Sequence, residues 1–358
     1  MPDAFEIDFL PVGDKSKSGD AIALRFGTYE NGVWKKQTVF VIDGGNMTSG
    51  ESLVTHINDI YKTDKVDRVI LTHPDGDHAS GLRAVVENMK VGKIWMHRPW
   101  NHWDDLASSI IDGRITKNSF GERLRTAYQY AYDIEQIAIK KKIEFYQPRQ
   151  GGFYRADDEK ILQILAPGKD FYLSLIQVSD KTPNMDISEG LMKSFAEAER
   201  EKANEDMTFE TENLSEEDEN TSAENDMSLI LYFTFAGKKV LFTGDAGTMG
   251  LYKAIRYAIE SNIDLKKLDL LQIPHHGSKH NLSKGVLQHI YAPQGVISCA
   301  KEGEPVHYSK IITNALRRRN IIPYKTQGTL LSYHSPNIPR REGYSGVIPI
   351  PFHPVVEL

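Results

Sequence analysis

Apolar and polar positions alternate along most of the chain with two different periods. Short runs of β-branched and apolar residues predict strands, and apolar residues three or four positions apart predict helices. The predicted strands span residues 5–12, 22–26, 38–43, 66–72, 93–97, 228–235, 239–243, 268–273, 295–300, 321–324 and 329–334. The predicted helices span residues 52–61, 81–89, 121–141, 247–259, 283–289 and 309–319. Strand–helix alternation in each half predicts an α/β fold.

This pattern breaks down over residues 171–225, which we expect to be an insertion within one domain spanning residues 1–358. Residues 185–205 are compatible with a surface helix, whereas residues 208–224 are rich in Glu, Asn, Ser and Thr and have little to bury. The latter stretch is predicted to be a mobile, solvated loop. The alternatives are an acidic lid that competes for the active site and a surface that binds a partner protein. Residues 335–358 form a predicted C-terminal extension.

The net charge of −6 conceals two oppositely charged parts. Residues 186–226 contain 15 acidic and 3 basic residues, so the rest of the chain has a net charge of +6. That basic remainder is compatible with a nucleic-acid substrate, which the overall acidic charge would disfavour. Cys299 is the only cysteine, which excludes an intramolecular disulfide and favours a reducing compartment. Without a signal-like start or an apolar run of roughly 20 residues, we expect a cytoplasmic protein.

Four potential metal ligands crowd into six residues directly after the predicted strand 66–72: His73, Asp75, Asp77 and His78. Two carboxylates this close repel each other unless a cation neutralises them. The cluster lies where a strand ends and the helix 81–89 begins, which is a usual place for sites in α/β proteins. It therefore predicts a metal site, and a helix-capping turn with surface histidines is the plainer alternative.

Two later segments also end apolar strands with ligand-type residues, namely Asp245 after the strand 239–243 and His275–His276 after the strand 268–273. These strand ends are expected to gather at one edge of the sheets. Imidazoles and carboxylates together suit divalent metals such as Zn, Mn or Fe. A carboxylate such as Asp245 can bridge two metals about 3.5–4 Å apart, with a shared hydroxide between them.

With these motifs the chain resembles the metallo-β-lactamase-fold hydrolases, whose signature at the first strand end is His-x-His-x-Asp-His. More narrowly, it is similar to the hydrolase domain of the bacterial competence channel proteins involved in DNA uptake. The narrower resemblance rests on residues 72–78 (THPDGDH), 225–231 (NDMSLIL), 241–245 (LFTGD) and 273–279 (IPHHGSK), and on a late His307. It covers roughly residues 7–333 and implies an αββα sandwich with a metal centre at the sheet edge.

The resemblance also implies two metal positions. One would take His73, Asp75 and Asp245, and the other Asp77, His78, Asp245 and one of His275 and His276, with His276 preferred. Asp75 stands where many family members have histidine, and a hard oxygen ligand favours manganese over zinc. The family's further histidine is not evident, although His97 and His102 are candidates. We therefore expect one or two divalent ions, Zn or Mn.

Further residues have predicted roles around this centre. Asp43 is expected to accept a hydrogen bond from a ligand histidine or to shape its own Asp-Gly-Gly turn. The predicted catalytic residues are Asp77 and His275; the latter would contact an oxyanion, protonate a leaving group or only shape its loop. Ser278 and Lys279 extend that loop, where Lys279 could attract a phosphate. His307 is a candidate rim residue or helix cap. Arg317–Arg319 predict a solvated basic helix end or a nucleic-acid contact.

The leading functional hypothesis is a metal-dependent hydrolase in which metal-bound hydroxide attacks phosphorus, with a DNA or RNA phosphodiester as substrate. The phosphodiester follows from the resemblance to the DNA-uptake proteins and from the basic remainder of the chain. One alternative is a hydrolase of a small ester of the phosphocholine, thioester or lactone type, because one fold supports all of these. Another is a non-catalytic protein that binds a partner.

Overall fold

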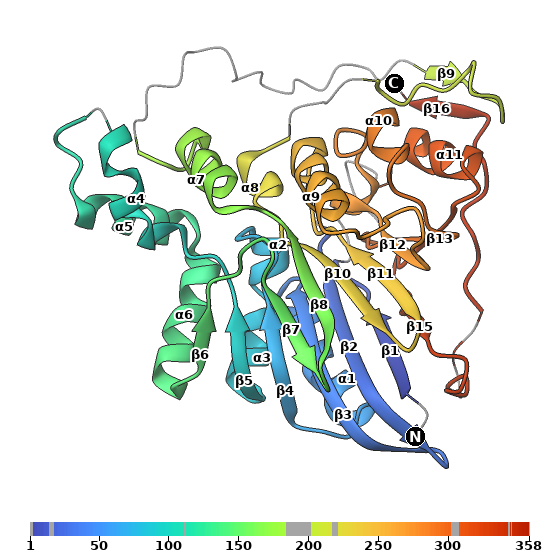
Figure 1. Ribbon diagram of the computed structural model, residues 1–358, viewed down its shortest axis with the longest axis horizontal. Helices are drawn as coiled ribbons and strands as arrows, with labels where there is room; N and C mark the ends of the chain where they lie inside the picture. The colour runs from blue at the N-terminus through green and yellow to red at the C-terminus, as the bar shows by residue number, and fades with distance from the viewer. Residues whose placement is uncertain are drawn as a thin grey trace.

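Two seven-stranded sheets face each other in the computed structural model (Figure 1). The structure describes residues 3–13, 18–110, 112–183, 202–216, 221–301, 308–342, 344 and 346–357. The first sheet has the strand order β15-β1-β2-β3-β4-β5-β6, and the second has the order β14-β13-β12-β11-β10-β8-β7. A separate two-stranded sheet joins β16 to β9.

The strands of these sheets have the following bounds: β1 Asp3–Phe9, β2 Ala21–Glu30, β3 Val33–Gly44, β4 Lys65–Ile70, β5 Lys90–Trp95, β6 Glu144–Tyr146, β7 Phe153–Ala156, β8 Glu159–Ala166, β9 Lys202–Asn204, β10 Ile230–Phe235, β11 Lys238–Phe242, β12 Leu270–Gln272, β13 Gln294–Ile297, β14 Ile322–Lys325, β15 Leu331–His334 and β16 Val355–Glu357. The helices are α1 Met47–Asp59, α2 Gly76–Ala79, α3 Leu82–Asn88, α4 Trp103–Leu106, α5 Lys117–Ala127, α6 Gln129–Lys141, α7 Lys169–Val178, α8 Ala223–Asp226, α9 Thr248–Glu260, α10 Lys284–Leu287 and α11 Lys310–Arg318. Short 3₁₀ turns lie at η1 Pro99–Asn101, η2 Ala107–Ser109 and η3 Pro274–Gly277.

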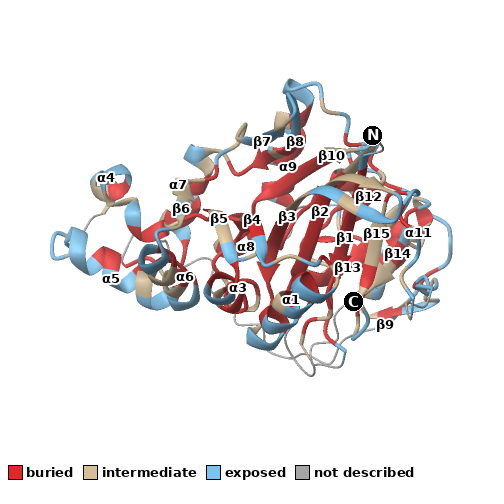
Figure 2. Cartoon of the chain, turned by 90° about the horizontal axis from the view of Figure 1, so that it is seen from below, coloured by how far each residue is buried: buried red, intermediate tan, exposed pale blue. Residues whose placement is uncertain are grey.

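Three apolar layers hold this arrangement together. Alternate residues of β1, namely Phe5, Ile7 and Phe9, are buried between the two sheets against side chains of the second sheet. A second layer lies between the first sheet and helices α1, α3 and α6, and a third lies between the second sheet and helices α9 and α11. Buried residues accordingly run along the central strands of the sheets (Figure 2). The result is the mixed α/β two-sheet sandwich that the sequence predicted.

Most predicted elements are present, and the helix predicted over residues 121–141 is the clearest error among them. The chain leaves helical geometry at Tyr128, which separates α5 from α6. The side chain of Tyr128 is buried and its hydroxyl donates to Glu224 at 2.7 Å. Apolar residues keep their helical spacing on both sides of Tyr128 because α5 and α6 each bury an apolar face. The periodicity of apolar residues alone therefore could not locate the break.

The predicted breakdown of pattern from residue 171 is also wrong at its start, because α7 runs through it to Val178. This helix buries Tyr172, Leu175 and Ile176, which have ordinary i, i+3, i+4 spacing. The expected surface helix over residues 185–205 lies largely outside the described residues. Its last part, Lys202–Asn204, is the strand β9, which pairs with β16 of the C-terminal extension.

The solvated loop expected for residues 208–224 is present only in part, because residues 208–210 are exposed whereas Glu212 and Leu214 are buried. Leu214 is buried among the side chains that cover the second sheet. Glu205 forms an ion pair with Arg318 at 3.0 Å, and Glu212 forms one with Arg319. Both glutamates are buried, and Arg318 in the last turn of α11 and its C-cap residue Arg319 neutralise them there.

The predicted solvated helix end at Arg317–Arg319 is wrong for the same reason. Arg318 is buried, and its guanidinium also donates to the carbonyl of Thr208 at 2.7 Å. Arg317 donates to the carbonyl of Ile350 in the C-terminal extension. None of the three is positioned as a free phosphate contact. Within the described chain, no helix is long and apolar enough to cross a membrane.

Strand direction decides which loops meet. In the first sheet, β3, β4, β5 and β6 are parallel neighbours, so their carboxyl ends share one edge. In the second sheet, β11, β12 and β13 are parallel as well. The two edges touch where the amide of Leu229 donates to the carbonyl of Thr72 at 3.0 Å. The candidate ligands predicted at strand ends therefore come together.

Candidate metal centre

The first part of the site is a buried turn after β4 that Asp43 holds in place. Asp43 ends β3 and accepts from the amide of Thr72 at 2.8 Å and from the Thr72 hydroxyl at 2.6 Å. The same carboxylate contacts Nδ1 of His78 at 2.8 Å. The predicted hydrogen bond from a ligand histidine is present, and the positive φ of 55° shows that Asp43 also shapes its turn.

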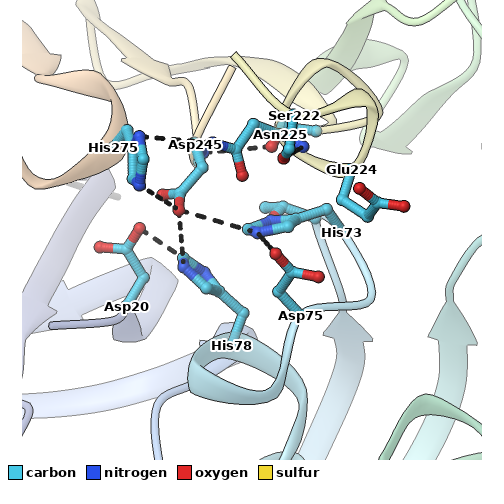
Figure 3. Close-up of polar contacts among 12 residues, drawn as sticks. Asp20, His73, Asp75, His78, Ser222, Glu224, Asn225, Asp245 and His275 are labelled. Atoms are coloured by element: carbon cyan, nitrogen blue, oxygen red, sulfur yellow. Dashed lines mark hydrogen bonds and ion pairs between the residues drawn. The ribbon is translucent and has the colours of Figure 1, made fainter. Parts of the chain in front are cut away.

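Asp245 is the centre of the site. It follows β11 through Gly244, which has φ of +51° and lies so close to Thr72 that a Cβ atom there would be 2.9 Å from the threonine hydroxyl. Imidazoles surround the carboxylate, and Figure 3 shows those of His73, His78 and His275 pointing toward it. The distances from Asp245 Oδ2 to the Nε2 atoms are 3.3 Å for His78, 3.6 Å for His276, 3.7 Å for His73 and 3.8 Å for His275.

The second nitrogen of each imidazole is held by the protein. Nδ1 of His73 contacts the Thr72 hydroxyl at 3.0 Å, and Nδ1 of His276 contacts the carbonyl of Ser298 at 2.8 Å. Nδ1 of His275 contacts Oδ1 of Asn281 at 2.9 Å. With Asp43 on His78, every ring is oriented so that Nε2 faces the shared carboxylate. Metal-binding histidines are usually fixed in this way by a partner on the other ring nitrogen.

Asp20 also lies at this site and was not among the predicted ligands. Its Oδ2 lies 3.9 Å from Nδ1 of His78 and accepts from the side-chain amide of Gln272 at 2.7 Å. Asp20 precedes β2, whereas the predicted ligands all follow strands. Because β2 is antiparallel to β3, its first residues lie at the edge where β3 ends. Ser228, whose hydroxyl accepts from the amide of Asp245 at 3.1 Å, precedes the antiparallel strand β10 in the same way.

Burial and charge shift several pKa values in this cluster. Burial raises the pKa of Asp20 to about 7, and the Asp245 and Asp43 carboxylates act in the same direction although His78 opposes them. Burial would also raise the pKa of Asp245, but His276, His78 and His275 hold it well below its usual range. Burial lowers the pKa of His276 to about 4. Burial likewise lowers the pKa of His73, so His73 and His276 are unprotonated beside an ionised carboxylate, which is the state that binds a metal. Burial lowers the pKa of His78 too, but Asp245 and Asp43 raise it well above 6.5, so His78 must lose a proton when a metal binds.

The donor set fits a divalent cation. Nε2 of His73, Nε2 of His78 and Oδ1 of Asp245 are buried and have no hydrogen-bond partner among the described residues. Such atoms are costly to bury unpartnered, and a metal ion satisfies them together. Ligand atoms lie within 4.8 Å of one another in the groups Asp20–His78–Asp245 and Asp77–His78–His276. The residues predicted for the second metal position therefore lie close together, and Asp20 is an additional candidate ligand.

The predicted first metal position is less complete. Asp75 is the N-cap residue of α2, and its Oδ2 lies 4.0 Å from Nε2 of His73. Its other oxygen lies 3.3 Å from the Lys181 ammonium, which is 3.6 Å from Glu224. Glu224 lies in the acidic stretch of residues 186–226 and is buried. A protein cation therefore shares the Asp75 carboxylate with any ion bound there.

The two histidines after β12 have unusual backbone conformations. His275 and His276 have φ of 45° and 55°, in a left-handed region that costs about 1–2 kcal/mol per residue without glycine. The amide of His275 donates to the carbonyl of Gly244 at 3.1 Å, which ties this turn to the Asp245 loop. Asn225 approaches Nδ1 of His275 at 3.3 Å, and Asn281 donates to the carbonyl of Asp245 at 2.9 Å. Strained residues held this firmly are common at functional sites.

The remaining predicted residues are placed in different ways. Ser278 and Lys279 lie in the loop after His276, where the Ser278 hydroxyl accepts from the amide of His280 at 3.3 Å. His307 lies outside the described residues. His97 and His102, the candidates for the family's further ligand, lie together after β5 and not beside Asp245. Both contact the side chain of Gln147.

Comparisons with known proteins add the following. The family model of the metallo-beta-lactamase superfamily matches residues 33–284, from β3 into α10 and over more than half of the chain. The metallo-beta-lactamase fold protein YhfI from Bacillus subtilis matches at 8% identity and a TM-score of 0.43, covering 92% of this chain and 99% of that chain. A diphosphatase from the PhnP family matches at 9% identity and a TM-score of 0.40, covering 92% of this chain and 98% of that chain. Yeast PDE1 matches at 12% identity and a TM-score of 0.38, covering 90% of this chain and 97% of that chain. The search of curated proteins gives no significant match.

Proposed function

The chain belongs to the metallo-β-lactamase superfamily, and on that premise we propose that it is a metal-dependent phosphodiesterase that cleaves DNA or RNA. The observation that carries the proposal is the convergence of four imidazole Nε2 atoms on the buried carboxylate of Asp245. No lysine or arginine of the described residues forms an ion pair with Asp245, Asp43 or Asp20. A divalent cation is the charge that this arrangement lacks.

In this proposal the ligands are His73, Asp75, Asp77, His78, Asp245 and His276, with Asp20 added. A divalent cation held by them would supply an activated water and offset charge on the transferring phosphoryl group. The carboxylate of Asp77 is half-buried beside His78 and His276, and it would take the proton of the attacking water.

His275 would protonate the leaving oxygen. Its side chain is 29% exposed, whereas those of His73, His78 and His276 are at most 3% exposed. Asn281 Oδ1 accepts from Nδ1 of His275, which leaves Nε2 facing the reacting groups. A general acid must lie within hydrogen-bond reach of the leaving group. His275 is the most exposed of the four histidines and is therefore the one best placed to reach it.

Two features support a phosphodiester over other esters. Oxygen ligands such as Asp75 suit harder cations, including Mn, which serve in phosphoryl transfer. The segments THPDGDH, LFTGD and IPHHGSK resemble the hydrolase domain of the DNA-uptake channel proteins. Lys279, at the rim, is a candidate for binding a backbone phosphate, whereas Arg317–Arg319 are not because they pair with the chain's own carboxylates and carbonyls.

The test is an activity screen with plasmid DNA, single-stranded DNA and RNA. The protein is first stripped with EDTA and then assayed with Mn²⁺, Zn²⁺ or no metal, and metal-dependent cleavage is expected. Asp245→Asn should remove it, and Asp59→Asn, at an exposed helix position, is the matched control. Turnover of a small chromogenic carboxylic ester without cleavage of any nucleic acid would overturn the phosphodiesterase and favour a small-ester hydrolase.

A second experiment tests the role of His275. His275→Ala should lose more rate on DNA, whose leaving alkoxide needs a proton, than on bis(p-nitrophenyl) phosphate, whose leaving group does not. His289→Ala, an exposed histidine after α10, should leave both rates unchanged. Equal losses on the two substrates would assign His275 to metal binding or to shaping its loop.

A further inference from the structure

A small polar pocket lies beside the metal centre and has no part in it. It is lined by residues that follow β5, β6 and β8 and by the start of α7: His97, His102, Asp105, Gln147, Pro148, Arg149, Pro167, Gly168, Lys169 and Tyr172. Since β4, β5 and β6 are parallel neighbours, the pocket opens at the same sheet edge as His73. Strands are spaced about 4.8 Å apart, so it is roughly 5–10 Å further along that edge.

Hydrogen bonds fix the tautomers of the two histidines in this pocket. The Gln147 side-chain amide donates to Nδ1 of His97 at 3.0 Å and to Nε2 of His102 at 3.3 Å. Nδ1 of His102 donates to Asp105 at 2.9 Å. In each neutral ring, the nitrogen that carries the lone pair accepts a hydrogen bond from Gln147, so no lone pair is available to bind a metal. The remaining nitrogen of His97, Nε2, must carry its proton.

Two donors in this pocket are buried without a partner. His97 is 7% exposed and Tyr172 is 2% exposed, and their rings stack at 4.0 Å. Neither Nε2 of His97 nor the Tyr172 hydroxyl has a hydrogen-bond partner among the described residues. Burying a donor unpaired costs about 1–3 kcal/mol, so both indicate a missing acceptor.

The charges around the pocket specify what kind of acceptor fits. Arg149 lies at the mouth and forms no ion pair within the described chain. Lys169 is paired with Asp105 at 2.8 Å, so these two charges neutralise each other. The guanidinium of Arg149 is therefore the charge at the pocket that no ion pair within the described chain neutralises. The first-turn amides of α7, whose N-cap is Gly168, add partial positive charge. All the unsatisfied groups are donors or positive, which selects an oxyanion.

We propose that this pocket, built around His97, Arg149 and Tyr172, binds a phosphate group. Its volume is about 50 Å³, and one water needs about 10–15 Å³ on the same measure, so a group of a few heavy atoms fits. In the working enzyme it takes a substrate phosphate next to the one being cleaved. This last step rests on the proposed phosphodiesterase function, whereas phosphate binding itself does not.

Binding is tested on EDTA-treated protein carrying Asp245→Asn, so that the metal centre cannot contribute. Inorganic phosphate is titrated by calorimetry against chloride at equal ionic strength. Saturable one-site binding is expected, about tenfold weaker in Arg149→Ala, and unchanged in Arg155→Ala, an exposed arginine of β7. No binding, or equal binding in both arginine variants, would overturn the pocket.

Tyr172→Phe separates a binding role from a structural one. Without phosphate, removing an unpaired buried hydroxyl should leave the melting temperature unchanged or raise it. The phosphate-induced rise in melting temperature should fall in the same variant. A lower melting temperature without phosphate, together with an unchanged phosphate effect, would assign the hydroxyl to the fold and overturn its part in the pocket.

The substrate arm compares short oligonucleotides with and without a 5′-phosphate in the active, metal-loaded protein. A terminal phosphate should lower KM several-fold, and this gain should disappear in Arg149→Ala but remain in Arg155→Ala. If phosphate binds to the metal-free protein but the terminal phosphate changes nothing, the pocket serves free phosphate and the substrate subsite is overturned. If no oligonucleotide is cleaved, the proposed function fails while the calorimetric result stands.

Discussion

Two buried clusters of acidic residues, one on β1 and one where the edges of the two sheets meet, are neutralised in opposite ways. On the outer face of β1, Glu6 and Asp8 meet Arg25 and Arg341, with Arg341 at 3.0 Å from Glu6 and 2.7 Å from Asp8. At the sheet edge, Asp20, Asp43 and Asp245 meet only imidazoles and neutral donors among the described residues. The first cluster balances its carboxylates with guanidinium groups of the chain, and the second does not.

The difference separates a structural cluster from a binding one. In the β1 cluster, His56 and the Tyr61 hydroxyl also contact Oδ2 of Asp8, at 2.8 Å each. Buried atoms without a hydrogen-bond partner among the described residues occur in both clusters, at Oδ1 of Asp8 in the first and at Oδ1 of Asp245 in the second. The clusters therefore differ in the guanidinium charge that neutralises them and not in the completeness of their hydrogen bonds. A buried carboxylate without a protein cation is stable only when it is protonated or when an external cation arrives. The edge cluster is thus incomplete until it binds a metal.

The largest expected effect is the loss of the metal centre. Asp245→Asn should reduce bound metal to background and lower hydrolysis by more than about a hundredfold, since the carboxylate faces all four imidazoles. Metal content by elemental analysis and the rate on nucleic acid are the measurements. Retention of stoichiometric metal would show that the edge cluster does not depend on this carboxylate.

The β1 cluster should respond to mutation in the opposite way. Arg341→Ala leaves Asp8 buried without its guanidinium, which should destabilise the fold by about 3–5 kcal/mol. Urea denaturation measures the loss, and metal content of the folded protein should not change. Arg340→Ala, exposed and adjacent, is the control. Combining Arg341→Ala with Asp8→Asn should restore part of the stability; no restoration would argue that packing and not charge is lost.

Asp43 tests how far the metal centre depends on its supporting hydrogen bonds. Asp43→Asn keeps the shape but weakens the contact with Nδ1 of His78. Metal affinity should fall by about 10–100-fold. A competition assay with a chelating dye gives the constant. Unchanged affinity would leave Asp43 with its turn-shaping role alone.

The two clusters should also differ in their pH dependence in metal-free protein. Burial raises the pKa of Asp8, but His56 and Arg341 hold it well below 3.8, so its contribution is present above about pH 4 and is lost as the pH falls further. Burial lowers the pKa of His78, but Asp245 and Asp43 raise it well above 6.5. Its contribution is therefore present below pH 6.5 and is lost on raising the pH through the folded value. The melting temperature of EDTA-treated protein should therefore fall both when the pH drops below about 4 and when it rises through the folded pKa of His78. Asp245→Asn should reduce only the decrease at high pH.

The smallest expected effect is at Asp75, where the protein supplies a cation of its own. Lys181→Met removes the ammonium 3.3 Å from Asp75, so a second metal should bind a few-fold more tightly. The exposed Lys117→Met is the control. Titration of Mn²⁺ into singly loaded protein reports the change. Weaker binding would mean that Lys181 orients Asp75 and does not compete with the metal.

Much of the fold and site could be predicted because strand ends are local features. His73, His78, Asp245 and His276 each follow an apolar run, and parallel strands bring such ends to one edge. Asp20 and Ser228 were missed because they precede antiparallel strands, whose starts reach that edge only through pairing. The helix break at Tyr128 was missed because its cause, Glu224, is 96 residues away.

The sequence by itself determined the ligand types, their order and the αββα class, since these depend on residues within a few positions of one another. Tertiary structure alone decided which charges are neutralised. Arg318 and Arg319 look like nucleic-acid contacts in the sequence, yet they pair with Glu205 and Glu212 more than 100 residues earlier. Asp245 carries the same charge as Glu205 and Glu212, yet among the described residues the side chains that pair with its carboxylate are all imidazoles. Electrostatic interactions act through space, so only the folded chain shows which carboxylates still require a cation.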